Sequence, residues 1–170
     1  KIVHLLRSPG GCPWDQVQTH QSIRRNFLEE TYEACEAIDT DDAALLCEEL
    51  GDVLLQVLFH TDIEQDCGRF TLDDVTDGIC KKLIYRHPHV FGSTEVCGTE
   101  EVLTNWDALK RAEKGQQTQT EVLSAVSRAL PALWRAEKVQ KKAEQAGIPA
   151  PDREAVLAQV QTISESLQTQ

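Results

Sequence analysis

Two short acidic stretches, Leu28-Glu-Glu-Thr-Tyr-Glu33 and Glu49-Leu-Gly-Asp52, decide how this 170-residue chain is interpreted. Residues three apart on an α-helix project from one face, a turn apart, so Glu30 pairs with Glu33 and Glu49 pairs with Asp52. Like charges at this spacing destabilise an isolated helix by about 0.2–0.5 kcal/mol, and partial burial raises that cost. A divalent cation between two such faces would remove the repulsion, and ligands that are all oxygen suit Mg²⁺ or Mn²⁺. The stretches therefore predict a metal site between two helices.

A solvated acidic face is the alternative interpretation. The chain also carries acids outside the two stretches, on segments that are predicted to be helical: Glu36, Glu48, Asp62 and Glu64. For any single glutamate, the solvated face is the simpler explanation. The two interpretations differ only for the acids taken together.

Composition limits the possible partners of the protein. The chain is 41% apolar and suits one domain plus a fragment, or two small domains. Its net charge of −11 disfavours nonspecific binding to nucleic acid or to an anionic membrane, because such binding depends on Lys and Arg. No apolar run approaches the roughly 18 residues of a membrane-spanning helix, and no signal peptide is visible. We expect a soluble protein that can bind a nucleotide only through metal ions and a few local cations.

The cysteines and the first residues give two further expectations. Six cysteines are scattered without a CxxC pair, which predicts reduced, partly buried thiols in a cytoplasmic protein. The sequence contains no Met and opens inside an apolar segment, so we expect its natural start to lie upstream.

The spacing of apolar residues predicts an all-α fold, because it is three or four almost throughout and no strand pattern is visible. The predicted helices cover residues 1–7, about 18–38, about 43–65, 71–86, 99–114, about 134–146 and 153–167. A loop rich in Gly and Pro separates the first two and holds Trp14 and Asp15. Gly51, inside the most apolar helix, indicates close approach of another backbone, since Gly costs about 1 kcal/mol there relative to Ala.

The acid pattern EExxE, followed fifteen residues later by ExxD, resembles that of the MazG nucleoside triphosphate pyrophosphohydrolases. Three flanking stretches agree with the family in the same order: Gly11-Cys-Pro-Trp-Asp15, Arg86-His-Pro-His-Val-Phe91 and Leu130-Pro-Ala-Leu133. Together these stretches run over most of the chain.

The resemblance implies a four-helix unit that assembles as a homodimeric helical bundle. Residues 1–114 would form the MazG-like domain, and residues 115–122 would be a linker. Residues 123–170 would be the start of a second, degenerate and truncated copy. Tandem copies occur in the family, but the segment that should carry EExxE here holds a single acid, Glu165.

The resemblance also implies attack of water on the α-phosphorus of a nucleoside triphosphate, which releases nucleoside monophosphate and pyrophosphate. Mg²⁺, or Mn²⁺ in its place, would be held by Glu30, Glu33, Glu49 and Asp52. Glu29 would be an acid or base just outside these ligands. The substrate would be bound by Lys82 and Arg86 at the phosphates, by Trp106 stacking on the base, by Lys110, and by Trp14 as a wall of the pocket.

Several of these residues have simpler structural explanations. Lys82 and Arg86 are expected near a helix C-terminus from the helix dipole alone, and Trp14 would pack over helix ends. His87 and His89 flank Pro88 and either bind metal or form a structural corner. For the whole protein, the alternatives to an enzyme are a catalytically weak nucleotide- and metal-binding regulatory module and an acidic helical adaptor. The sequence does not reveal which base or sugar is preferred.

Overall fold

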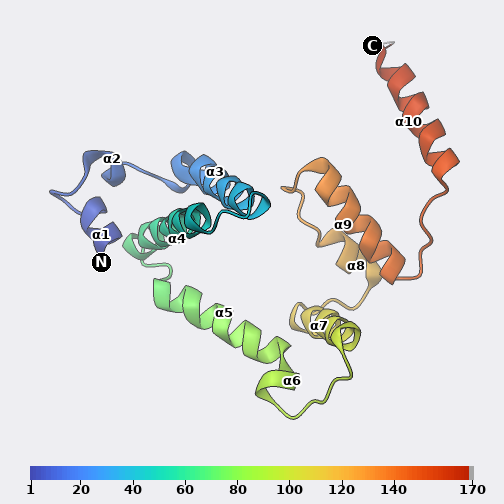
Figure 1. Cartoon of the computed structure of the whole chain (residues 1–170), viewed down its shortest axis with the longest axis horizontal. Coiled ribbons are helices and arrows are strands. Elements are labelled where there is room, and N and C mark those ends of the chain that lie inside the picture. The colour runs from blue at the N-terminus through green and yellow to red at the C-terminus, as the bar shows by residue number, and fades with distance from the viewer. Residues whose placement is uncertain (169–170) are drawn as a thin grey trace. The chain divides into compact units, whose positions relative to one another are not determined.

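The computed structural model describes residues 1–168, which form ten α-helices and no β-strand (Figure 1). The helices are α1 (Ile2–Arg7), α2 (Pro13–Gln16), α3 (His20–Asp39), α4 (Ala43–Asp66), α5 (Leu72–Arg86), α6 (Pro88–Phe91), α7 (Thr99–Glu113), α8 (Gln119–Ser124), α9 (Ala132–Gln145) and α10 (Arg153–Gln168). The prediction of an all-α fold is confirmed. The chain divides into two compact units, Lys1–Tyr85 and Arg86–Gln170, and each is described by itself. This division differs from the domain boundaries expected from the sequence, which stay a prediction.

The first unit is built on a hairpin of α3 and α4, which lie side by side (Figure 1). Thr19 begins α3 with a capping box, because its side chain accepts from the Ser22 amide and the Ser22 hydroxyl accepts from the Thr19 amide. The Asp42 carboxylate begins α4 by accepting from the amides of Ala44 and Leu45, each at 3.0 Å. The turn between the helices is too short for anything but an antiparallel pair.

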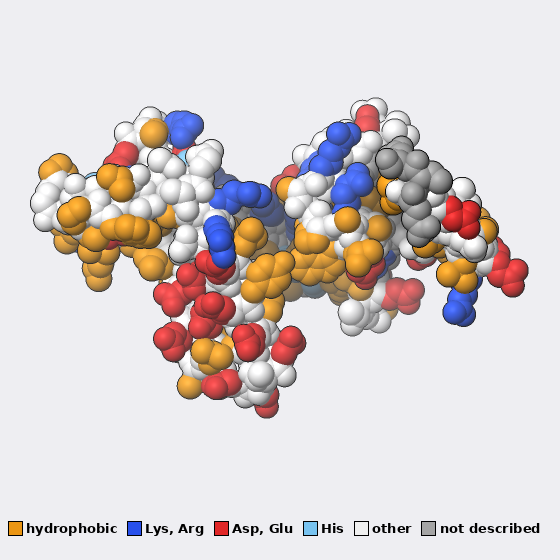
Figure 2. Space-filling model, turned by 90° about the horizontal axis from the view of Figure 1, so that it is seen from above, with side chains coloured by type: hydrophobic (Ala, Val, Ile, Leu, Met, Phe, Trp, Pro, Cys, Tyr) orange, Lys and Arg blue, Asp and Glu red, His pale blue; other side chains and the backbone are white. Residues whose placement is uncertain are grey.

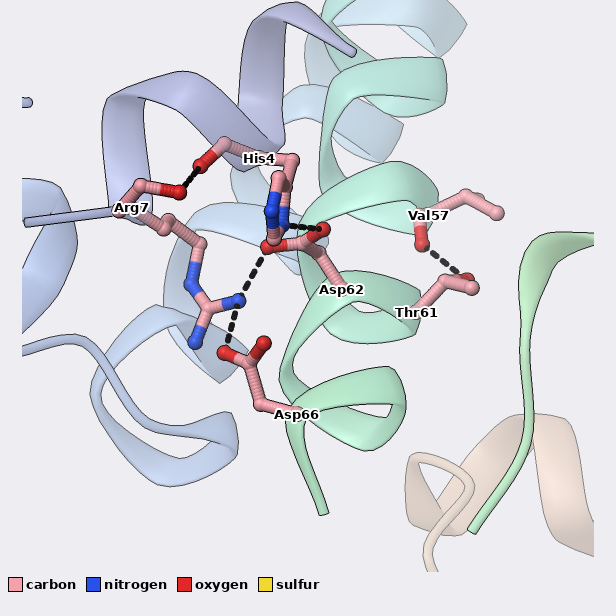
Figure 3. Close-up of polar contacts among 7 residues, drawn as sticks. His4, Arg7, Val57, Thr61, Asp62 and Asp66 are labelled. Carbon is pink, nitrogen blue, oxygen red and sulfur yellow. Dashed lines mark hydrogen bonds and ion pairs between the residues drawn. The ribbon is translucent and has the colours of Figure 1, made fainter. Parts of the chain in front are cut away.

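An ion-pair network holds α1 against α4 (Figure 3). The Arg7 guanidinium lies between the carboxylates of Asp62 and Asp66, and the His4 ring contacts Asp62 at 3.2 Å. Arg7 also lies over the Phe59 ring, with its Cζ 5.7 Å from the ring centroid. Beside this network Val3, Ile23 and Phe59 form the small apolar core.

A second polar group joins the start of α3 to the end of α4. His20 contacts His60 through their Nδ1 atoms at 2.7 Å and contacts Glu64 at 2.5 Å, while Arg69 pairs with the same glutamate. Burial, and then the neighbouring His20, lower the pKa of His60. The folded state therefore favours neutral His60, whereas the unfolded state takes up the proton more readily. The free energy of unfolding should fall as the pH drops below about 6.5.

The burial pattern of α4 is the reverse of the one expected. Its buried residues are mostly polar: Glu49, Gln56, Phe59, Thr61, Asp62 and Glu64. Leu50 and Leu54, which follow the apolar spacing of this helix, are 55% and 56% exposed. A side chain at Gly51 would meet nothing within 4 Å, so the predicted approach of another backbone is absent from the described residues. On α5 no described residue is buried either.

Four local predictions are corrected by the structure. Trp14 and Asp15 lie in a short helix, α2, because Pro13 at its first position favours helical backbone. His89 lies in α6, begun by Pro88 in the same way. Residues 119–122 of the expected linker belong to α8, which the Thr118–Glu121 capping box begins. Five of the six thiols are exposed and only Cys12 is partly buried, since much of the helix surface is uncovered.

The second unit is less densely packed. Val122 and Val126, at and just after α8, are its buried apolar residues within the described part of the chain. The α9 helix packs on α8, and the Gln145 amide donates to Asp107 of α7 at 3.4 Å. In residues 1–168 no helix is long and apolar enough to cross a membrane.

Replacement of Arg7 by Ala should destabilise the first unit. The Arg7 and Asp62 side chains are 8% and 11% exposed, and breaking a buried ion pair leaves an uncompensated charge. We expect a loss of about 3 kcal/mol in the free energy of unfolding, measured by urea denaturation. Arg25→Ala is the control, because its pair with Glu29 is solvent-exposed and should be worth less than about 1 kcal/mol. Equal losses in the two variants would contradict this account of how α1 is held.

Candidate functional site

Three carboxylates from α3 and α4 come together on the inner face of the hairpin. One oxygen each of Glu30, Glu49 and Asp52 lies within 4.8 Å of the others. Glu33, a turn further along α3, is close enough to affect the ionisation of Glu30 and Glu49. The structure thus brings together three of the four predicted ligands, whereas Glu33 is exposed and lies outside the group, and its role as a ligand stays a prediction.

Burial and mutual repulsion disfavour the charged forms of these acids. The pKa of Glu30 is raised, first by burial and then by Asp52 and Glu33. The pKa of Glu49 is raised by burial, Glu33 and Asp52, in that order. Among the described residues no Lys, Arg or His forms an ion pair with Glu30, Glu33, Glu49 or Asp52. The group therefore lacks a compensating cation within the described chain.

The oxygens of this group fit a divalent cation. Glu49 is 8% exposed, and its Oε2 is buried without a hydrogen-bond partner in the described part of the chain. A buried carboxylate oxygen without a partner carries a desolvation cost of about 1–3 kcal/mol or more, which a metal ion would remove. Several carboxylate oxygens, without His or Cys, suit Mg²⁺ or Mn²⁺ better than Zn²⁺. Since protons compete with metal for raised-pKa acids, metal affinity should fall as the pH is lowered.

Glu29 lies outside this group. Its carboxylate accepts from Arg25 Nε at 2.8 Å on the exposed side of α3. Its charge contributes to the raised pKa of Glu30, after burial, Asp52 and Glu33. A role for Glu29 as an acid or base beside the metal stays a prediction.

Trp14 lies at the rim of a cavity of about 140 Å³, whose lining includes Asn26 and Gln56 of the hairpin but none of the three carboxylates. Trp14 is 57% exposed, whereas Asp15 is 9% exposed and faces the cavity. The other polar residues that line the cavity are Asn26 and Gln56. Asn26 lies four residues before Glu30 on α3, and Gln56 lies four residues after Asp52 on α4. Neither amide was predicted from the sequence. Their spacing of one turn from the acids was the available signal.

The remaining predicted substrate residues fall into separate groups. Lys82 is exposed on α5, and no acid of the described chain pairs with it. Arg86 begins the second unit and donates to Glu113 at 2.6 and 2.8 Å. Its guanidinium also lies over Trp106, 5.9 Å from the ring centroid.

His87 and Lys110 belong to the same part of the second unit. The His87 ring meets Trp106 edge-on at 4.7 Å, and its centroid is 5.6 Å from that of His89, which supports the structural-corner interpretation of this segment. The pKa of Lys110 is lowered, mainly by burial and then by Lys142 and Lys114. A buried ammonium beside other cations would be stabilised by an anion such as phosphate.

Another acidic group in the first unit, which contains Asp62 and Asp66, does not resemble a metal site. His4 completes a set of ligand atoms within 4.8 Å of one another. The Arg7 guanidinium already pairs with both aspartates, as Figure 3 shows. A metal ion would have to displace it, so the group is a structural network.

The fold and the carboxylate group define an all-α protein with a candidate divalent-metal site. Residues 18–91 match the MazG nucleotide pyrophosphohydrolase domain, and the chain therefore contains a domain of the MazG family. The match begins just before α3 and ends with α6, so it includes both acid-bearing helices.

Curated relatives extend the similarity beyond this domain. "Nucleoside triphosphate pyrophosphohydrolase/pyrophosphatase MazG" of Thermotoga maritima is 41% identical over 160 residues, which cover 94% of this chain and 61% of that protein. "Nucleoside triphosphate pyrophosphohydrolase" of Escherichia coli K12 is 44% identical over 147 residues, covering 86% of this chain and 56% of that protein. "Uncharacterized protein YabN" of Bacillus subtilis is 51% identical over 140 residues, covering 82% of this chain and 28% of that protein. The chain thus spans 28% to 61% of the length of these relatives.

Substitution of a carboxylate should separate stability from metal binding. Glu49→Gln and Asp52→Asn each delete a charge at nearly constant volume. At pH 7.5 the metal-free variants should be as stable as the wild type or slightly more stable, because repulsion falls. The gain for Glu49→Gln should vanish as the pH falls towards 4.5, since protonation removes the same charge in the wild type.

Mg²⁺ should stabilise the wild type but not Glu49→Gln or Asp52→Asn. A ligand at a hundredfold excess over its Kd adds about 2.7 kcal/mol to the free energy of unfolding, which thermal denaturation with and without Mg²⁺ measures. Glu36→Gln, on α3 but outside the acid group, is the matched control and should keep the metal response. If all three variants respond to metal like the wild type, the acids are a solvated surface.

Proposed function

We propose that this protein is a Mg²⁺-dependent pyrophosphohydrolase that converts nucleoside triphosphates to nucleoside monophosphates and pyrophosphate, as housekeeping of the nucleotide pool. The observation that carries the proposal is the group of Glu30, Glu49 and Asp52, with its unpartnered buried oxygen. The printed names of the Thermotoga and Escherichia relatives support the same activity.

Phosphoryl-type chemistry depends mainly on aligning the attacking water with the phosphorus and on neutralising the charge of the phosphate oxygens. Bound Mg²⁺ would supply positive charge at the phosphate oxygens and make a nearby water more acidic. The chain's own task is to hold the carboxylates of Glu30, Glu49 and Asp52 together, which two packed helices do better than a loop. Glu29 would take a proton from the attacking water, which requires its pair with Arg25 to open.

The cations act on the phosphates in this proposal. Lys82 has no partner in the described chain and can turn to an anion at little cost. Arg86 is held by Glu113 and by Trp106, so its guanidinium is oriented before a substrate binds. Lys110 would contact a further phosphate. Trp106, predicted from the sequence to stack on the base, would instead hold Arg86 in place, because the Arg86 guanidinium lies over its ring.

We also propose that two copies of the chain form a homodimer through the outer faces of the hairpin and α5. The hairpin buries polar residues inside and leaves apolar ones outside, and α5 exposes Val75, Ile79 and Leu83 at 37%, 44% and 41%. Acidic side chains gather on part of the surface among exposed apolar ones (Figure 2). Exposed apolar patches of this kind mark contact surfaces. A second copy supplies an apolar surface of the same kind, which a dimer about a twofold axis requires.

Leu54→Asp should dissociate the dimer. The substitution places a charge within an apolar interface, so the mass in solution, measured by light scattering, should fall to that of one chain. Leu157→Asp on α10 is the control, because Leu157 is 57% exposed and Leu54 is 56% exposed. A wild-type protein that is already monomeric at micromolar concentration would contradict the proposed assembly.

The activity is tested by the products. Wild-type protein with Mg²⁺ and a triphosphate should release pyrophosphate and monophosphate, and EDTA should abolish turnover until Mg²⁺ or Mn²⁺ is restored. Orthophosphate and diphosphate would sink the assignment to the α-phosphorus. Calorimetric binding of metal and nucleotide without any product identifies a regulatory module, and no binding heat identifies an adaptor.

A further inference from the structure

We propose that the cavity beside Trp14 holds the base of the triphosphate and favours bases that carry an amino group next to a ring nitrogen, as adenine and cytosine do. The inference rests on the proposed function, because it takes the phosphates to lie at the carboxylates. It assigns specificity to Asp15, Asn26 and Gln56.

The position of the cavity suits a base whose phosphates lie at the carboxylates. Asn26 and Gln56 face each other across the hairpin, as Glu30 and Asp52 do one turn away. Four residues of helix advance about 6 Å along the axis. A sugar spans a gap of this size between the α-phosphorus and the base, so both ends of one nucleotide can be bound by the same pair of helices.

The size of the cavity selects part of a nucleotide rather than the whole. Its volume is about 140 Å³, well below the roughly 300 Å³ at which pockets for complete drug-sized ligands begin. It therefore has room for one ring system. The phosphates and most of the sugar must remain outside, on the side where the carboxylates lie.

The lining combines an apolar interior with a few polar groups, as a base requires. Leu6, Ile23, Leu55 and Phe59 supply the apolar part. Trp14 stands at the rim with more than half of its surface exposed, where its ring can cover the face of a base. Ile23 and Phe59 belong to the core and are 2% and 5% exposed, which keeps this end of the cavity rigid.

The polar groups lack partners. Asp15 and Gln56 are 9% and 8% exposed, yet neither side chain makes a hydrogen bond within the described residues. Their polar atoms are not fully enclosed, because among the described residues only Arg7, Glu49 and Arg135 have buried side-chain atoms without a partner, so water in the cavity can solvate them. A ligand that displaces this water meets an acceptor and an amide that no protein group occupies. The loop before them is tightly fixed, because a side chain at Gly11 would come within 2.2 Å of the Leu5 carbonyl oxygen.

The chemistry of these groups determines which base edge fits. A carboxylate only accepts hydrogen bonds, whereas an amide both donates and accepts. Asp15 therefore requires an N–H donor on the base, and the amide NH₂ of Gln56 or Asn26 matches an adjacent ring nitrogen. Adenine and cytosine present this pair, and carboxylate and amide side chains are the groups that recognise it elsewhere. Replacing the amino group by a carbonyl would set two acceptors, the carbonyl and Asp15, against each other.

Matched triphosphates test the selection directly. CTP and UTP, like ATP and ITP, differ by exchange of an amino group for a carbonyl. In each pair the wild-type kcat/KM should be at least about tenfold higher for the amino member, since one base contact is worth about 1–3 kcal/mol. Ratios near one in both pairs, or higher values for UTP and ITP, would overturn the proposal.

Variants assign the selection to the cavity. Asp15→Asn keeps the size of the side chain but replaces an acceptor by a donor, so both ratios should fall to about one or invert. Gln56→Met removes the amide at similar length, and should lower kcat/KM for CTP and ATP about tenfold. The Gln56→Met variant still tests the cavity if Asp15→Asn fails to fold. Asp73→Asn, an exposed acid on α5, is the control and should keep both ratios.

Binding separates this inference from the proposed activity. If no triphosphate is hydrolysed, the proposed function fails, but the dissociation constants of CMP and UMP with Mg²⁺ still report on the cavity. Calorimetry should show CMP bound at least about tenfold more tightly, with the preference lost in Asp15→Asn. Equal affinities, or no binding of either monophosphate, would overturn the base assignment by themselves.

Discussion

The repulsion among Glu30, Glu49 and Asp52 is the constraint on which the first unit depends. Three carboxylates within 4.8 Å of one another repel and so oppose the packing of α3 on α4. Burial and this repulsion raise the pKa values of Glu30 and Glu49. The hairpin is held at its ends instead, by helix caps at the turn and by the networks around Arg7 and His20 at the other end. Because the two ends hold the helices together, the middle of the hairpin can carry the negative charge of the three carboxylates, which a bound cation would neutralise.

The sequence was sufficient for the elements and for the acid group. Spacing of three and four and the Gly and Pro breaks located the longer helices to within a few residues. The acid pairs could be placed because helix geometry alone sets residues three apart on one face. Their convergence needed one more condition, a turn short enough to make the helices antiparallel neighbours, and residues 39–42 provide it.

The sequence could not predict which face of each helix would be covered. Leu50 and Leu54 satisfy every local rule for a core position, yet they are exposed, because the hairpin closes on its polar side around the acids. Gly51 was misread for the same reason, since the surface near it is uncovered. Trp14 and the segment 119–122 were local errors, where a Pro or a capping box started helices too short to show periodicity. Asn26 and Gln56 could not be predicted as binding residues from the sequence, because only the fold shows that they line one cavity with Asp15.

Placing metal ligands and base contacts on the same two helices has a consequence for specificity. The phosphates and the metal are common to every triphosphate, so they supply affinity without discrimination. Under our proposals, discrimination falls to Asn26 and Gln56, one helical turn away from the carboxylates, and to Asp15 of α2 across the cavity from them. Because α3 and α4 pack against each other and carry both the acids and the two amides, a base that does not fit the cavity would shift the α-phosphorus relative to the acids. A displacement of about 1 Å there can cost about a hundredfold in rate, so selection between bases should be expressed in kcat as well as in KM.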